Sequence, residues 1–486
     1  MNTLTIRLDD PIGTIRPEVY GHFAEHLGRC IDEGIWVGEE SPIPHIDGVR
    51  RDTVEALRAI AAPVIRWPGG CFADDYHWED GVGPREKRPR RVNLWWHQEE
   101  SNAFGTDEFI RLCRLVGAEP YVCTNVGSGS PQEARNWLEY CNYEGDTHYS
   151  RLRGTKGYKV KYWGIGNENW GCGGQFDPVD YAKEYRRFAN YLRQLDRSIQ
   201  LIACGHTTPD WNLKFMETMG HLGLIDHLSI HRYVGCGNDV EFSDQEYYTL
   251  IARSLQVDDD IRKTDEVLSF FAGGRKNIGI IVDEWGVWHP QARGNQGLEQ
   301  KNTLRDAIVA AGVLDIFNRW ALRVTMGNLA QTINVLQCIA QTEGEKFWVT
   351  PTYHVFRMYR EHMGNTSLRM DVDCETMEVP LDPGKNVEIG IVSASASFNQ
   401  EQKRLVISVV NRHLTEEVEC TIRVKGDGAL RGEKVTVLTA DDVRMSNGPD
   451  GADKVVPRED GVEITGSEFR YVTPPHSIHV FSFGIA

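Results

Sequence analysis

Short apolar segments alternate with amphipathic segments over the first two thirds of this chain, and this alternation constrains the fold more than any other feature. Eight apolar segments have the character of buried strands, at residues 20–23, 63–67, 120–124, 160–165, 201–204, 227–230, 278–282 and 324–329. Helical patterns lie between them, for instance at 51–60, 104–116, 180–195 and 303–319. Strands that alternate with helices favour a parallel sheet. Eight such strands predict an α/β fold, a closed (β/α)8 TIM barrel rather than an open sheet, although periodicity alone does not enforce the count.

The pattern changes near residue 367. Short alternating segments follow at 387–393, 404–410, 417–424, 433–439 and 477–483, with Asp, Gly and Pro turns between them. They predict a C-terminal all-β sandwich, jelly-roll-like in type. The strand at 3–8 has no helix after it, so we expect it to pair with the sandwich. The expected division is therefore an N-terminal strand in 1–15, a catalytic barrel in 16–366 and a β-sandwich domain in 367–486.

The distribution of tryptophan separates the roles of these two domains. All 13 tryptophans lie between Trp36 and Trp348, and none lies in the predicted sandwich. Sugar-binding surfaces usually place aromatic faces against the C–H patches of a sugar ring. The sandwich is therefore expected to be a structural partner of the barrel rather than a carbohydrate-binding module.

Charge and cysteine content exclude several classes of function. The formal net charge of −17 argues against nucleic acid, which needs basic stripes. The basic segment 85–91 contains Glu86 and Pro89 and follows Pro84, and it is expected to be a loop with structural ion pairs. The eleven cysteines include no CxxC motif, so the sequence indicates neither a zinc site nor a disulfide framework.

The N-terminal residues have neither the basic start nor the apolar run of a signal peptide. No uncharged apolar stretch reaches the roughly 18 residues that a membrane helix needs. These observations predict a reduced, soluble, cytoplasmic protein without a membrane partner.

Two glutamates follow predicted strands directly. Glu168 follows the strand at 160–165 and Glu284 the strand at 278–282, and the two are 116 positions apart. The carboxyl ends of barrel strands meet at one face, where catalytic groups of such enzymes lie. Carboxylates at the mouth of an apolar barrel are costly to desolvate, so their presence needs a reason. A converging pair favours cleavage of a glycosidic bond, with one Glu protonating the leaving oxygen while the other attacks or stabilises the anomeric carbon.

Other polar residues at the predicted strand ends allow more than one interpretation. Arg66 either holds neighbouring carboxylates or touches the substrate. His22, His26 and His231 are either hydrogen-bonded core residues or metal ligands, but their spacing fits no helix-borne ligand motif, and we expect neither a metal nor a cofactor. Trp78, Trp95 and Trp96 either pack a loop or form a platform for sugar.

Several motifs in the same order resemble those of glycoside hydrolase family 51. The segments are YGHFAEHLGR (20–29), RWPGGCF (66–72), YHWEDGVGP (76–84), GNE (166–168), DEWGVW (283–288) and NLAQTINV (328–335). The likeness is strongest to the intracellular α-L-arabinofuranosidases of that family, and it extends over the whole chain.

The resemblance implies roles for the matching residues. Glu168 is similar to the general acid/base and Glu284 to the nucleophile of a retaining mechanism. Tyr233 resembles the tyrosine that orients the nucleophile, and Trp288 an aromatic wall of the pocket. Arg66 and His231 are expected to support these groups.

Sugar contacts are also implied. Glu25 resembles the carboxylate that holds arabinose hydroxyls, while Asn167 and Gln331 resemble amides that contact the sugar. One position departs from the common pattern: Cys71 stands where the family often has Asn. A thiol is a weaker hydrogen-bonding group than an amide, so the contribution of Cys71 to substrate binding is in question.

The resemblance implies an exo-acting enzyme that releases terminal non-reducing α-L-arabinofuranosyl residues from oligosaccharides derived from arabinan or arabinoxylan. It also implies a homo-oligomer such as a hexamer. One alternative is a retaining glycosidase of the same fold that acts on β-glucan or β-xyloside. Another is a non-catalytic sugar-binding or scaffold protein, which the presence of both glutamates disfavours.

Overall fold

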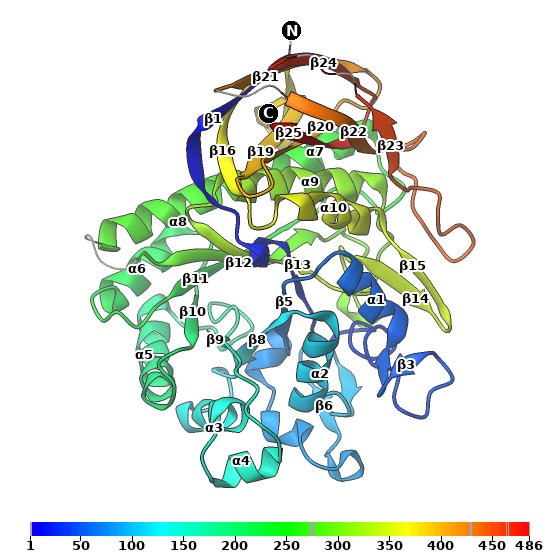
Figure 1. Cartoon of the computed structure of the whole chain (residues 1–486). Helices are drawn as coiled ribbons and strands as arrows, with labels where there is room; N and C mark the ends of the chain where they lie inside the picture. The colour runs from blue at the N-terminus through cyan, green and yellow to red at the C-terminus, as the bar shows by residue number, and fades with distance from the viewer. Residues whose placement is uncertain (1, 273–276, 427–429, 463, 465, 486) are drawn as a thin grey trace.

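The computed structural model describes residues 2–272, 277–426, 430–462, 464 and 466–485 (Figure 1). Eight parallel strands close a barrel in the order β10-β11-β12-β13-β2-β5-β8-β9. They are β2 (Gly21–Phe23), β5 (Val64–Trp67), β8 (Glu119–Thr124), β9 (Tyr162–Ile165), β10 (Gln200–Cys204), β11 (His227–Val234), β12 (Gly279–Val287) and β13 (Val324–Ala330). Each overlaps one expected strand, so the predicted (β/α)8 barrel is confirmed.

Strands β11 and β12 run further than expected. They continue to pair in parallel beyond the barrel, with His231 beside Glu284 and Val234 beside Val287. The sequence pattern missed this extension because polar residues interrupt the apolar run. His231, Tyr233 and Glu284 consequently lie on paired strands and not on loops, which restricts their backbone.

Several helices around the barrel begin at a side chain that caps the first turn. At the start of α5 the Asp177 side chain accepts from the backbone N–H groups of Val179 and Asp180. The helices are α1 (Arg51–Ala59), α2 (Thr106–Val116), α3 (Pro131–Asn142), α4 (His148–Arg153), α5 (Pro178–Leu195), α6 (Pro209–Met219), α7 (Asp244–Ser254), α8 (Gln256–Ala272), α9 (Leu304–Arg319) and α10 (Pro351–Tyr359). Helix α9 lies between the barrel and the sheet domain in Figure 1, and residues 304–318 are all buried.

The second domain is built on a nine-stranded sheet in the order β23-β22-β25-β20-β19-β16-β1-β21-β24. Strand β1 (Asn2–Thr14) lies inside this sheet, antiparallel to β16 (Thr366–Asp373) and parallel to β21 (Val418–Lys425). The remaining strands are β19 (Val392–Asn399), β20 (Arg404–Asn411), β22 (Leu430–Leu438), β23 (Arg458–Gly461), β24 (Glu468–Thr473) and β25 (Ser477–Ile485). The domain limits at residues 15 and 366 stay a prediction.

The strand pattern of this domain was only partly predicted. The segments expected at 404–410, 417–424, 433–439 and 477–483 overlap β20, β21, β22 and β25. The expected strand at 387–393 is wrong, because the chain ends β18 (Lys385–Gly390) and begins β19 within it. The pattern also missed the edge strands β23 and β24, which are short and have half or more of their residues exposed.

Four two-stranded sheets complete the described structure: β3–β4 (His45–Ile46 with Val49–Arg50), β6–β7 (Arg91–Asn93 with Gln98–Glu100), β14–β15 (Ala340–Glu343 with Lys346–Val349) and β17–β18 (Thr376–Asp382 with Lys385–Gly390). The basic segment beside β6 forms the expected ion pairs, which are Arg85 with Glu39 and Glu108, Arg88 with Glu108, Arg90 with Glu99, and Arg91 with Asp80. Among the described residues no helix combines the length and apolar character needed to cross a bilayer.

Candidate active site

Glu284 on β12 is held by two donors, one on the neighbouring strand β11 and one on β5, three positions away in the barrel order. Arg66 of β5 donates from Nη1 to Glu284 Oε1 at 2.7 Å, and the Tyr233 hydroxyl of β11 donates to Oε2 at 2.8 Å. Burial, and next the charge of Glu284, raise the pKa of Tyr233 well above its usual range, so this hydroxyl stays protonated and able to donate. The carboxylate is therefore oriented before any ligand arrives.

Glu168 follows β9 at a turn with unusual backbone geometry. Its φ is 42°, in the left-handed region that a side chain such as Glu rarely adopts. The side chain is 20% exposed, against 7% for Glu284. One oxygen of Glu168, one oxygen of Glu284 and one ring nitrogen of His231 lie within 4.8 Å of one another. The fold thus brings together the two glutamates that the sequence singled out.

His231 connects both glutamates to a buried aspartate. Its Nδ1 lies 2.8 Å from Glu168 Oε1 and 3.6 Å from Glu284 Oε2, and its Nε2 lies 3.2 Å from Asp283 Oδ1. Burial opposes a charge on the ring, but the surrounding carboxylates outweigh it and raise the pKa of His231 to about 10. We therefore take His231 as an imidazolium that donates to Glu168 and to Asp283.

Asp283 is a member of this site that sequence reasoning missed. Its Oδ2 accepts from the Tyr121 hydroxyl at 2.7 Å and lies 3.5 Å from Arg66 Nε, while its Oδ1 accepts from the Ser229 hydroxyl. Burial by itself would raise the pKa of Asp283, but Arg66 and His231 hold it well below its usual range. Its place next to Glu284 in a buried strand was the signal that could have identified it.

Glu25 lies at the end of β2 among donors. It accepts from the backbone N–H of Phe72 at 3.2 Å, from Trp96 Nε1 at 3.0 Å and from Gln331 Nε2 at 2.9 Å. Burial first, and then the charge of Glu284, raise the pKa of Glu25 to about 7. Gly70 is needed beside it, because a Cβ there would lie 2.7 Å from both carboxylate oxygens.

The two residues Asn167 and Trp288 complete the set expected to contact sugar. Asn167 Oδ1 accepts from Arg66 Nη2 at 2.6 Å, so the same guanidinium orients Asn167 and Glu284. Trp288 is 37% exposed and meets the Tyr233 ring edge-on, with 5.4 Å between ring centroids. Roles in sugar binding remain proposals for both.

The open questions about the other aromatic and histidine residues are answered by their contacts. Trp96 joins the site through Glu25, whereas Trp78 is buried and stacks on Trp137. His26 accepts from Trp67 Nε1 at 3.0 Å and lies 2.8 Å from Glu100, and burial lowers the pKa of His22 to about 3. His22 and His26 are therefore core residues, while His231 belongs to the site.

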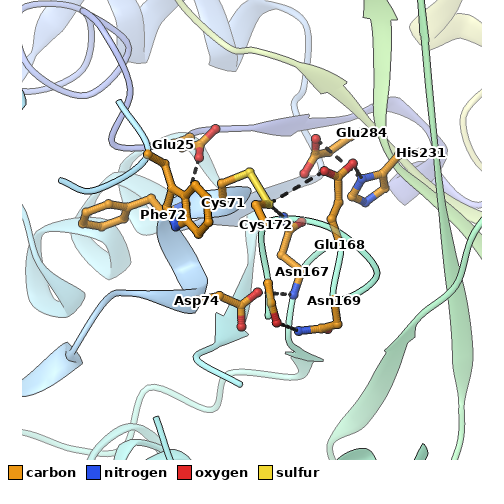
Figure 2. The surroundings of a disulfide bond; sticks show 12 residues. Glu25, Cys71, Phe72, Asp74, Asn167, Glu168, Asn169, Cys172, His231 and Glu284 are labelled. Atoms are coloured by element: carbon orange, nitrogen blue, oxygen red, sulfur yellow. Dashed lines mark hydrogen bonds and ion pairs between the residues drawn. A yellow bond between two sulfur atoms is a disulfide. The ribbon is translucent and has the colours of Figure 1, made fainter. Parts of the chain in front are cut away.

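Cys71 requires a correction. The sequence indicated no disulfide and a thiol at this position, but Cys71 is bonded to Cys172 across 101 positions (Figure 2). Cys71 begins the short helix η2 (Cys71–Asp74) after β5, and Cys172 lies in the turn after β9. The barrel places these two loops side by side, which spacing along the chain does not reveal. Cys71 therefore carries no S–H group for hydrogen bonding.

Comparison with known proteins agrees with the geometry. Residues 56–249 match the family model of the α-L-arabinofuranosidase 1 domain, and residues 283–477 match that of the α-L-arabinofuranosidase C-terminal domain. An intracellular exo-α-L-arabinofuranosidase of Bacteroides ovatus is 42% identical over 454 residues, which cover 90% of this chain and 87% of the relative.

Solved structures extend the likeness to three dimensions. The family 51 arabinofuranosidase of Xanthomonas axonopodis pv. citri superposes with a TM-score of 0.94 at 34% identity, covering 99% of this chain and 100% of that one. The α-L-arabinofuranosidase of Thermotoga maritima, solved as an arabinose complex, gives a TM-score of 0.90 at 34% identity and covers 99% of each chain. With paired glutamates at the mouth of its barrel and this likeness along its whole length, the chain belongs to the α-L-arabinofuranosidases of glycoside hydrolase family 51.

Proposed function

We propose that Glu284 is the nucleophile and Glu168 the general acid/base with which this glycoside hydrolase releases terminal non-reducing α-L-arabinofuranosyl residues. The observation that carries the proposal is the approach of one oxygen of each glutamate to within 4.8 Å. Retaining enzymes hold their two carboxyl groups about 5–5.5 Å apart, whereas inverting enzymes leave room for water at roughly 6.5–9.5 Å.

The first step forms a covalent intermediate. Glu284, ionised beside Arg66, attacks the anomeric carbon while Glu168 gives its proton to the departing glycosidic oxygen. His231 donates to Glu168 Oε1, so Oε2 is the oxygen available to hold that proton.

The second step releases arabinose. Glu168, now a carboxylate, takes a proton from water as the water oxygen attacks the anomeric carbon and Glu284 leaves. Two displacements at the same carbon retain the anomeric configuration. The imidazolium of His231 stabilises the negative charge that Glu168 carries between the two steps.

Recognition of the sugar is assigned to the groups around Glu25. This carboxyl group, the amides of Gln331 and Asn167, and the face of Trp288 surround the space beside the two glutamates. The Cys71–Cys172 disulfide adds a wall without a proton to donate. We therefore assign Cys71 no hydrogen bond with the substrate.

The natural substrates follow from where the enzyme works. We propose a cytoplasmic location and imported arabino-oligosaccharides, derived from arabinan or arabinoxylan, as substrates. The name of the Bacteroides ovatus relative, an intracellular exo-acting enzyme, supports both. A homo-oligomer such as a hexamer is part of the same proposal and is tested by light scattering of the purified protein.

The test is release of 4-nitrophenol from 4-nitrophenyl α-L-arabinofuranoside, with the β-D-xyloside and β-D-glucoside run beside it. We expect fast turnover of the arabinoside alone and its loss in Glu284→Ala. Activity on a pyranoside without activity on the arabinoside would keep the glutamate pair and overturn the assigned sugar.

A further inference from the structure

The disulfide lies in direct contact with the proposed acid/base. Cys172 Sγ is 3.9 Å from Glu168 Oε2 and 3.8 Å from Asn167 Nδ2. Cys71 precedes Phe72, whose backbone N–H donates to Glu25. Figure 2 shows the bond between Glu25 on one side and Glu168 with His231 on the other. The disulfide therefore contacts Glu168 and Asn167, and it is one residue away from the backbone N–H that binds Glu25.

The bond restrains the turn that carries Glu168. Glu168 has the left-handed backbone that costs free energy for a non-glycine residue, so its conformation needs support from its surroundings. His231 contacts one carboxylate oxygen, and the disulfide sulfur is the neighbour of the other. Without the bond, Cys172 would be free to move, and its thiol could donate to Oε2 and stabilise the carboxylate of Glu168. The first change would displace the carboxyl group from the leaving oxygen, and the second would leave less of Glu168 protonated to act as the general acid.

The two loops stay joined when the bond is open. Asp74, at the end of η2, accepts from the backbone N–H of Asn167 at 2.8 Å, and from those of Val126 at 2.7 Å and Gly127 at 2.9 Å. These hydrogen bonds connect the loops after β5, β8 and β9 next to the disulfide. Opening the bond should therefore change the position of Glu168 without unfolding the barrel.

The pair is also more accessible than most cysteines of the chain. Cys71 and Cys172 are half-buried, whereas seven of the nine free cysteines are buried. Burial raises the pKa of the buried thiols, for instance Cys30 to about 11, which leaves them unreactive. Cys236 and Cys374 are the half-buried free cysteines.

We propose that the Cys71–Cys172 disulfide positions Glu168 for acid catalysis, and that its reduction by a dithiol slows hydrolysis of substrates whose leaving group needs a proton. This inference rests on the proposed role of Glu168. One thiolate of the dithiol attacks Cys71 or Cys172 and the other cysteine leaves as a thiolate. The second thiol of the reductant, as a thiolate, then attacks the reductant's sulfur in the mixed disulfide, and the remaining cysteine leaves as a thiolate. Two electrons and two protons pass to the cysteine pair, and the reductant becomes a disulfide.

The experiment compares two arabinofuranosides on the full chain before and after dithiothreitol treatment. Phenyl α-L-arabinofuranoside needs acid assistance, whereas the 2,4-dinitrophenyl compound has a leaving group that departs unprotonated. Thiol counts after denaturation should rise from nine to eleven. We expect kcat/KM on the phenyl compound to fall about tenfold or more, and on the dinitrophenyl compound less than about twofold, because only the former loses acid catalysis.

Variants distinguish the effect of the Cys71–Cys172 disulfide from the effect of the free thiols. The double variant Cys71→Ser, Cys172→Ser should behave like the reduced enzyme and not respond to dithiothreitol. Cys236→Ser and Cys374→Ser, which leave the disulfide intact, should respond as the wild type does. Circular dichroism of the double variant should match that of the wild type.

Three results would overturn the inference. The first is a count of eleven thiols in the untreated enzyme that stays at eleven after incubation with oxidised glutathione. The second is an unchanged kcat/KM on both substrates once eleven thiols are present. The third is an equal fall of kcat/KM on both substrates. An oxidised enzyme that is inactive on both arabinofuranosides would overturn the proposed function as well, so the two failures are distinguishable.

Discussion

At the scale of single residues, the two glutamates proposed as catalytic differ in what surrounds them. Glu284 accepts from a guanidinium on β5 and a phenol on β11, so its position is set by rigid barrel strands. Glu168 is more exposed, sits on a turn and contacts one histidine and one sulfur. A nucleophile needs fixed alignment with one carbon, whereas an acid/base must reach the leaving oxygen and then water.

Replacement of each glutamate should therefore leave a different residual activity. Glu168→Ala should lower kcat/KM on phenyl α-L-arabinofuranoside by about 10²–10⁴-fold and spare the first step on the dinitrophenyl compound. Glu284→Ala should abolish hydrolysis of both compounds, because even a good leaving group cannot compensate for the loss of the nucleophile. Steady-state and burst kinetics measure this, with Glu345→Ala, an exposed position in the β14–β15 turn, as the control. Equal loss on both substrates in Glu168→Ala would contradict its role as the acid.

Another residue-scale prediction concerns stability against pH. The pKa of His231 is raised from 6.5 to about 10 in the folded protein, so its ion pairs stabilise the fold fully below about pH 6.5. That contribution is lost as the pH rises towards 10. The free energy of unfolding should fall over this range by on the order of 2 kcal/mol more in the wild type than in His231→Gln. Urea unfolding at several pH values measures it, and parallel curves for the two proteins would refute the assignment.

At the scale of elements, strand order decides which segments are indispensable. Strand β1 is inside the nine-stranded sheet, and its residues alternate, with Leu4 and Ile6 fully buried and Thr5 facing the other side. An N-terminal segment of this kind cannot be removed without splitting the sheet and leaving one edge of β16 and one edge of β21 unpaired.

The alternation of β1 predicts unlike effects of neighbouring substitutions. Leu4→Ala should destabilise the sheet domain by about 2–5 kcal/mol, the usual range for truncating a buried leucine. Thr5→Ala should cost less than about 1 kcal/mol. All 13 tryptophans lie in the barrel region, so far-UV circular dichroism reports both domains while tryptophan fluorescence reports the barrel. Similar unfolding curves for the two variants would show that β1 is not held as described.

At the scale of the whole molecule, helix α9 joins the barrel to the sheet domain through a buried carboxylate. Asp315 accepts from the hydroxyls of Ser393 at 2.9 Å, Ser395 at 2.9 Å and Ser408 at 2.6 Å. Burial raises the pKa of Asp315, and the three hydroxyls partly offset that effect. The cluster lies where residues from both domains exclude water.

Removal of this carboxyl group should weaken the junction. Asp315→Ala leaves buried hydroxyls without their acceptor, at a cost of about 1–3 kcal/mol for the unpaired groups. We expect calorimetry to show the sheet domain and the barrel unfolding further apart in temperature than in the wild type. Asp453→Ala, at an exposed position, is the control. Identical thermograms would show that Asp315 does not couple the domains.

The sequence predicted the barrel well because the barrel strands are buried on both faces and therefore consist of continuous apolar residues. It predicted the sheet domain less well, since β23 and β24 lie at edges and carry many exposed residues. It also missed the extension of β11 and β12, where catalytic polar residues replace the apolar pattern. Local patterns fail where function or exposure changes the composition of an element.

By itself the sequence determined the eight-stranded barrel and the two glutamates that follow its apolar strand segments, because burial along a strand is a local property of a chain. Tertiary structure alone decided that Arg66 orients Glu284, that Glu284, Asp283 and Glu168 keep His231 charged, and that Cys71 is bonded to a cysteine 101 positions away. These contacts join different strands and loops. They depend on how the barrel closes and how its loops pack, and distance along the chain carries no information about either.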